Sequence, residues 1–306
     1  MTALYAGPPT VLHTGTVDAS PPPGAGEREP VRIGSSQVLL AVALLVAWFL
    51  LYLFVFSGIE QGHAQSELYE EIRTELAEGT APTGAPIAAG SPVAVLSIPG
   101  AGIDDIVVVE GSRPAQLQDG PGHVLGSVLP GQRGVSVIAG RSLSFGGPFA
   151  DIADLPYGAP ITVTTGQGSF AYEVVSVRTK GDPMPAAPPA DGARLTLVTS
   201  QRGSGMAGLQ AAQSLYVDAV LTDGAVAGGP VATKDVGVPL MSGGLDTATL
   251  ALLALSLQLL VLALVGFVWS WLKWSRSAAW IALGPCVLAA LWLVSSIGTR
   301  LLPGLI

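Results

Sequence analysis

The sequence predicts a mainly β domain that is held at a membrane by three transmembrane α-helices and a helical stalk. The mean hydropathy is +0.55, and only 12% of the residues are charged, well under the roughly 25% typical of soluble globular chains. Three stretches are apolar over the roughly 20 residues that a bilayer crossing needs. Between the first and second stretches, short β-type runs alternate with Gly and Pro turns.

Residues 1–36 are predicted to be a disordered cytoplasmic tail, because the segment ASPPPGAGEREP is rich in Pro and Gly and poor in large apolar side chains. The first apolar stretch comes too late and is too long for a cleaved signal peptide, so we interpret it as an uncleaved anchor. The transmembrane helices are assigned to residues 37–57, 248–272 and 278–297.

The charge distribution predicts the orientation of the chain. The segment 57–247 carries nine Lys and Arg against nineteen Asp and Glu, whereas the rest of the chain carries five against three. Lys and Arg near the ends of spans remain cytoplasmic. The N-terminus and the KWSR turn are therefore expected inside and the middle domain outside, as in a multi-pass plasma membrane protein. Arg300, after the third span, is the one exception.

The segment that follows the first span divides into four parts. Residues 58–80 form the predicted helical stalk, in which Leu68, Ile72 and Leu76 recur every four residues. A Pro/Gly linker (81–91) leads to the β domain (92–222), and a Gly-rich linker (223–247) leads to the second span.

Seven strands are predicted in the β domain, and they suggest a sandwich or a small barrel. At about 130 residues the domain is long enough to bury its own core. The predicted strands are Val93–Ile98, Asp105–Glu110, Gly134–Ala139, Ala159–Thr165, Phe170–Arg178, Ala193–Ser200 and Leu215–Leu221.

The β domain also resembles a known family. The stretches that carry the likeness, in order along the chain, are LSIPGAGIDDIVVVEG, LQDGPGHVLGSVLPGQRGVSVIAG, FGGPFADIADLPYGAPITVTTGQGSFAYEV, RLTLVTS and SLYVDAVL. Together they resemble the sortases, and most of all the actinobacterial class E type. The resemblance covers roughly residues 92–221 and implies a closed, eight-stranded sortase-like β-barrel.

The resemblance implies a transpeptidase with three catalytic residues. A cysteine thiolate attacks the peptide carbonyl, a histidine after VIAG protonates the leaving amine, and an arginine on the last strand stabilises the oxyanion. In this chain the three positions hold Ser200, Arg141 and, within a residue or two, Ser214. A serine hydroxyl is a weak nucleophile without an adjacent base, and a guanidinium stays protonated. The single cysteine, Cys286, lies in the third predicted span.

We therefore expect no catalytic residues, and we interpret the chain as a catalytically inactive sortase-like protein that binds or assembles molecules at the cell envelope. The alternative is a sortase-type transpeptidase or hydrolase that uses Ser200 as its nucleophile. Arg141, Ser200 and Ser214 are candidates for lining a binding groove, in which Arg141 would pair with a carboxylate. A surface ion pair with a nearby Asp is the simpler interpretation of Arg141.

Two further residues of the β domain carry groups that could act as a base. His123 is interpreted as a turn-stabilising residue, because the family's GPGH histidine is not its catalytic one. Lys180 is a formal candidate for a Ser–Lys dyad, but it stands in an exposed-looking loop.

Cofactors and partners follow from the composition. One cysteine and three scattered histidines predict no metal site and no cofactor. The acidic middle domain argues against nucleic acid. The expected partners are the lipid bilayer and a secreted or membrane protein, or a peptide, at the cell envelope.

Overall fold

The computed structural model of the chain describes residues 35–201, 213–231, 247–274 and 276–301. Almost all of the predicted N-terminal tail and residues 232–246 of the predicted Gly-rich linker therefore lie outside the described residues.

The first helical region is uninterrupted from Ser35 to Glu78. It comprises α1 (Ser35–Leu51), the π-helical turn η1 (Tyr52–Phe56) and α2 (Ser57–Glu78). Gly79 ends the helix in the left-handed conformation, with φ of 68°, and its N–H bonds back to the carbonyls of the last turn. This is the usual way in which a glycine caps a helix C-terminus.

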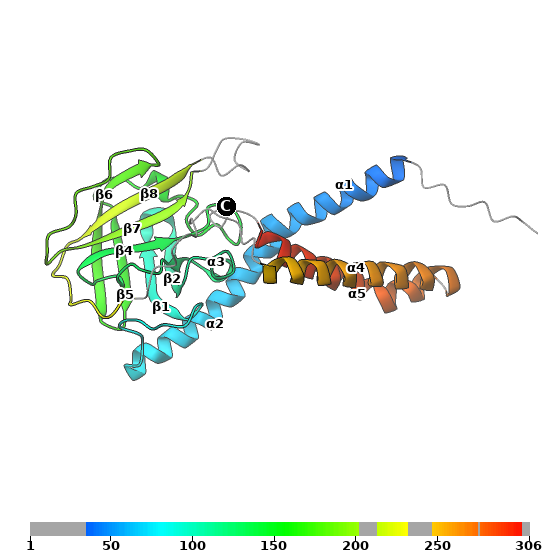
Figure 1. Cartoon of the computed structure of the whole chain (residues 1–306), viewed down its shortest axis with the longest axis horizontal. Coiled ribbons are helices and arrows are strands. Elements are labelled where there is room, and N and C mark those ends of the chain that lie inside the picture. The colour runs from blue at the N-terminus through cyan, green and yellow to red at the C-terminus, as the bar shows by residue number, and fades with distance from the viewer. Residues whose placement is uncertain (1–34, 202–212, 232–246, 275, 302–306) are drawn as a thin grey trace, which may run out of the picture. The chain divides into compact units, whose positions relative to one another are not determined.

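Two further helices follow the β domain, α4 (Thr247–Lys273) and α5 (Arg276–Thr299), and they run side by side (Figure 1). The helices Val42–Glu78, α4 and α5 are long and apolar enough to cross a membrane. The predicted combination of a mainly β domain with three membrane-type helices is confirmed.

The β domain is a closed, eight-stranded barrel, which confirms the fold implied by the family resemblance. The strand order is β1-β2-β3-β4-β7-β8-β6-β5. The pairs β2–β3 and β4–β7 are parallel, and the other pairs are antiparallel. The strands are β1 (Pro92–Ile98), β2 (Ile103–Glu110), β3 (Gly122–His123), β4 (Gly134–Ala139), β5 (Pro160–Thr165), β6 (Gly168–Thr179), β7 (Ala193–Ser200) and β8 (Ser214–Leu221).

Strand β7 lies between β4 and β8 and is buried along its whole length (Figure 1). Leu195 and Leu197 pack into the main core of the barrel. Val198 faces a second, smaller cluster with Leu117 and Ala139. Leu117 belongs to the short helix α3 (Gln116–Asp119), which lies in the connection between β2 and β3. This connection therefore covers the outer face of β7 at Val198.

The side chain of Gln65 fastens α2 to the barrel. Its Oε1 accepts a hydrogen bond from the Val107 amide (2.7 Å), and its Nε2 donates to the carbonyls of Val107 (3.1 Å) and Asp119 (2.8 Å). The amide of Gln65 thus bonds to β2 as a peptide group of a neighbouring strand would.

Candidate functional site

The three family positions meet at one end of the barrel. In the parallel pair β4–β7, Ala139 is opposite Val198. Both strands run on toward the same end of the barrel, where Arg141 follows β4 and Ser200 ends β7. Ser200 is also the cross-strand partner of Ser214 on β8. Ser214 is the first residue of β8.

The guanidinium of Arg141 is enclosed by protein, with 0% of the residue exposed. Its Nε and Nη2 donate to the carbonyls of Leu117 (3.0 Å) and Pro114 (3.1 Å), and its Nη1 donates to Ser144 Oγ (3.0 Å). The ring of Phe145 lies 4.9 Å from the guanidinium carbon. Burial lowers the pKa of Arg141 from 12.5 to about 10.

This arrangement differs from both sequence-based interpretations of Arg141. The side chain neither lies on the surface nor offers a cation that solvent or a ligand can reach. It joins the β2–β3 connection to the loop that follows β4, and this places its positive charge among oxygen acceptors in the interior.

The hydroxyl of Ser200 is bonded to another serine. Ser200 Oγ and Ser142 Oγ lie 2.6 Å apart, and each residue is only 4% exposed. Two further hydrogen bonds keep β4 and β7 together at this point. Thr199 Oγ1 donates to the Gly140 carbonyl (2.9 Å), and the Gly140 amide donates to the Val198 carbonyl (2.9 Å).

Ser214 and Lys180 are joined by a backbone hydrogen bond. The Lys180 amide donates to the Ser214 carbonyl at 3.1 Å, and the Lys180 residue is exposed. Ser214 is 7% exposed.

The ring of His123 is engaged on both nitrogens. Nδ1 lies 2.8 Å from Glu110 Oε2, and Nε2 lies 3.0 Å from the Val128 carbonyl and 2.9 Å from Ser127 Oγ. These contacts fix the turn after β3, in agreement with the turn-stabilising role expected from the sequence. The other described histidine, His63, is an exposed residue of α2.

Four residues near the site escaped the sequence analysis: Ser57, Ser142, Ser144 and Phe145. The Phe145 amide donates to Ser57 Oγ (3.0 Å), and this hydroxyl donates to the Leu53 carbonyl (2.5 Å) in the π-helical turn. The loop after β4 is therefore seated on the first helical region. The two serines in RSLSFGGP, directly after the family's VIAG segment, are the one signal in the sequence that pointed to this loop.

Among the described residues, no group of three or more His, Cys, Asp or Glu side chains is placed to hold a metal ion.

Comparisons with known proteins give the following matches. The family model of the sortase domain matches residues 96–220. A sortase D5 transpeptidase from Clostridium perfringens is 24% identical, with a TM-score of 0.44 over 53% of this chain and 99% of its own. A lid mutant of sortase A from Corynebacterium diphtheriae is 22% identical, with a TM-score of 0.39 over 53% of this chain and 95% of its own. Sortase E from Streptomyces avermitilis is 25% identical, with a TM-score of 0.37 over 45% of this chain and 92% of its own. None of the curated proteins matches the chain.

Proposed function

This chain carries a sortase domain over residues 96–220, and from that premise we propose that it is a non-catalytic sortase-like protein. It acts as a membrane-anchored module that binds or assembles other molecules at the outer face of the cell envelope. Its N-terminus is cytoplasmic, and its barrel stands outside the membrane, as the distribution of Lys and Arg predicts. Its partners are a secreted or membrane protein, or a peptide, at that surface.

The observation that supports the proposal most strongly is the pairing of Ser200 with Ser142 at 2.6 Å. A serine nucleophile needs a base that accepts its proton, and the serine hydroxyl that lies 2.6 Å from Ser200 Oγ is a poor base. Arg141, which follows the family's VIAG segment, has a pKa of about 10. It is therefore protonated at neutral pH and acts as a donor only.

The remaining groups that drive sortase-type chemistry are engaged elsewhere. The only cysteine of the chain, Cys286, lies in the membrane-type helix α5. The only histidine of the barrel, His123, bonds to Glu110 and to the turn after β3. These observations favour a binding role over the alternative, a transpeptidase or hydrolase that uses Ser200.

The enzyme alternative is tested with full-length protein in lipid nanodiscs. We expect that a fluorophosphonate probe and a sorting-signal-type peptide ester leave Ser200 unmodified in intact-mass measurements, and that Ser200→Ala gives the same result. A known serine hydrolase confirms that the probe is reactive. Acylation that disappears in Ser200→Ala would refute the proposal.

The binding role is tested in native membranes with a cross-linker that does not cross the bilayer. We expect tagged full-length protein to retain a defined envelope protein or peptide in stoichiometric amounts, whereas protein in which the barrel was unfolded before cross-linking retains none. Equal recovery from both samples would contradict a specific binding role.

A further inference from the structure

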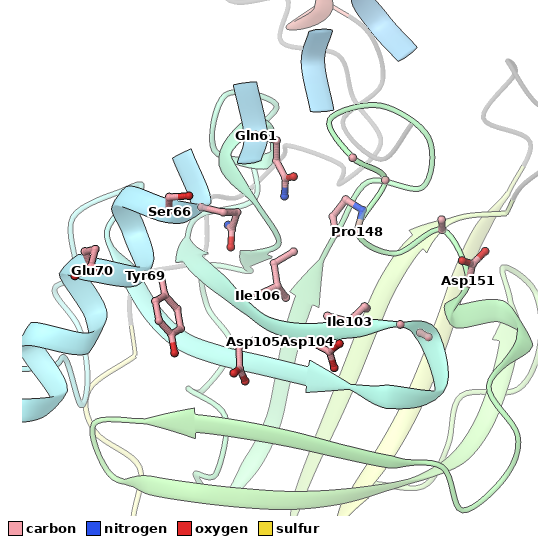
Figure 2. A pocket seen from close by; sticks show the side chains of 16 residues that line it. Gln61, Ser66, Tyr69, Glu70, Ile103, Asp104, Asp105, Ile106, Pro148 and Asp151 are labelled. Carbon is pink, nitrogen blue, oxygen red and sulfur yellow. The ribbon is translucent and has the colours of Figure 1, made fainter. Parts of the chain in front are cut away.

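We propose that the groove between α2 and β2 is a docking site for an extended, positively charged peptide segment. The groove has a volume of about 660 Å³, within the roughly 300–1,000 Å³ of typical ligand sites. Its three walls are the segment Gln61–Glu70 of α2, residues 101–106 at the start of β2, and residues 146–151 of the loop after β4 (Figure 2).

One wall of the groove is the first part of β2, whose edge away from β1 is only partly free. Strand β3 pairs with β2 only at Val109 and Glu110. Just before these residues, the side chain of Gln65 takes the place of a strand by bonding to both backbone groups of Val107. Residues 103–106 line the groove, and in the described part of the chain no strand pairs with them on the side away from β1. The Asp105 amide does not belong to the free part of this edge, because it donates to Ser97 Oγ on β1 (3.2 Å). Extended peptides commonly bind by continuing the free backbone groups of such an edge.

The charge of the groove selects the occupant. Glu70 on α2 and the adjacent Asp104 and Asp105 on β2 are exposed and line the groove, and Asp151 lines its third wall (Figure 2). None of the sixteen described lining residues is Lys, Arg or His. Such a surface attracts positive charge and repels anionic ligands.

The distribution of these carboxylates favours a peptide over a single ion. They come from separate walls, and no three ligating side chains of the described residues come together as a metal site. The charges are therefore spread along the groove, as the charges of a peptide with two or more Lys or Arg residues would be.

The groove also offers apolar surface beside its charges. Tyr69 is 39% exposed, and it lines the groove together with the half-buried Ile106 (Figure 2). Lys and Arg side chains pack their aliphatic stems on such surfaces while their charged ends reach polar groups, and an aromatic ring also attracts a cation at its face. This combination fits a basic peptide better than a small amine.

The inference does not depend on the proposed function, because no family position lines this groove. It also adds to that function by naming the chemistry of a ligand. A groove that binds no peptide would not bear on whether Ser200 is catalytic. Acylation of Ser200 would not bear on whether the groove binds a peptide.

The test uses fluorescence anisotropy with full-length protein in nanodiscs of zwitterionic lipid at low salt. The probes are a labelled hexapeptide of alternating Lys and Val, its Glu counterpart, and a Lys/Val peptide with N-methylated backbone amides. We expect binding of the first probe only. Because exposed ion pairs are individually weak and three are removed, the triple variant Glu70→Gln, Asp104→Asn, Asp105→Asn is expected to bind about tenfold more weakly. Asparagine also tolerates the positive φ of Asp105 (51°).

The matched control removes the same number of carboxylates elsewhere, with Glu71→Gln, Glu78→Gln and Asp191→Asn, all exposed and outside the groove lining. This variant is expected to bind like the wild type. An equal loss in both variants would reduce the effect to overall charge and overturn the proposal. Binding of the Glu peptide, or no binding of the Lys/Val peptide, would overturn it as well. Equal binding of the N-methylated peptide would refute strand addition at β2.

Discussion

The hydroxyl oxygens of Ser142 and Ser200 lie 2.6 Å apart, although the two residues are 58 positions apart in the sequence. Ser142 follows β4, and Ser200 ends β7. The parallel register of these strands carries both chain segments to the same end of the barrel. Both residues are buried, so each hydroxyl is a satisfied polar group that would lose a partner if the other were removed.

We expect Ser200→Ala to lower the free energy of unfolding by about 1–2 kcal/mol, because a buried hydrogen bond is lost and the Ser142 hydroxyl loses this partner. The double variant with Ser142→Ala should cost less than the sum of the single variants by about 0.5–1 kcal/mol. Denaturant unfolding of the full-length protein in detergent, followed by circular dichroism, measures both quantities.

Ser136→Ala is the matched control for this cycle. Ser136 is a buried serine of β4 whose Oγ has no hydrogen-bond partner among the described residues. We expect Ser136→Ala to leave the free energy of unfolding unchanged, and its effect should be additive with that of Ser200→Ala. Strict additivity between Ser142→Ala and Ser200→Ala would show that the two hydroxyls do not depend on each other.

A second prediction concerns the contact between the loop after β4 and the first helical region. Ser57 Oγ accepts the Phe145 amide at 3.0 Å, and both residues are 1% exposed. Ser57→Ala leaves this amide without its acceptor, which costs about 1–3 kcal/mol when the amide stays buried. We expect hydrogen exchange of residues 141–149 to become at least fivefold faster.

Thr74→Ala provides the comparison. Thr74 makes the same type of hydrogen bond to a carbonyl four residues back, that of Glu70 at 2.8 Å, and within the described residues it makes no hydrogen bond to the loop. Exchange of the loop should remain unchanged in this variant. Unchanged loop exchange in Ser57→Ala would show that the loop is held by other contacts.

The sequence predicted the long strands well and the surroundings of the site poorly. Strands such as β4 and β7 coincide with the predicted ranges, because apolar runs bounded by glycine and turn residues are legible locally. Strand β3 has two residues, too few to show a period of two. The predicted start at Asp105 is two residues late, since β2 begins at Ile103 and Asp105 itself has a φ of 51°.

The burial of Arg141 was invisible in the sequence for a different reason. Its backbone acceptors are the carbonyls of Pro114 and Leu117, 27 and 24 residues earlier in the chain. Every residue has a backbone carbonyl, so residue types do not show which carbonyls will accept hydrogen bonds from a buried arginine. The same holds for Ser57, whose role depends on where the loop after β4 meets the first helical region.

The proposed orientation in the membrane gives a third prediction. In a Cys286→Ala background, which has no other cysteine, Asp191→Cys places a thiol at an exposed position between β6 and β7. Trp274→Cys places one at the exposed end of α4. A maleimide that cannot cross membranes should label the first variant in intact cells and the second only after the cells are opened. The reverse pattern would invert the proposed topology.

The last prediction concerns alkaline pH and rests on Tyr172. This side chain is 1% exposed, and its hydroxyl oxygen accepts a hydrogen bond from the Gly131 amide at 2.6 Å. Burial raises the pKa of Tyr172 from 10.0 to about 12, although the Gly131 amide opposes the shift. Below pH 10 the folded and unfolded chains both keep the phenolic proton. Between pH 10 and 12 the unfolded chain loses it first, so the free energy of unfolding falls as the pH rises.

The rise of the pKa from 10.0 to about 12 corresponds to a loss of roughly 2–3 kcal/mol in the free energy of unfolding once the pH exceeds the folded pKa. Tyr172→Phe lacks this loss but leaves the Gly131 amide without its acceptor, which costs about 1–3 kcal/mol at every pH. The variant should therefore be less stable than the wild type at pH 8, and the difference should shrink or reverse toward pH 11.5. Tyr157→Phe, at a residue 77% exposed, should follow the wild type throughout. A constant gap between the wild type and Tyr172→Phe would show that Tyr172 does not hold its proton in the barrel.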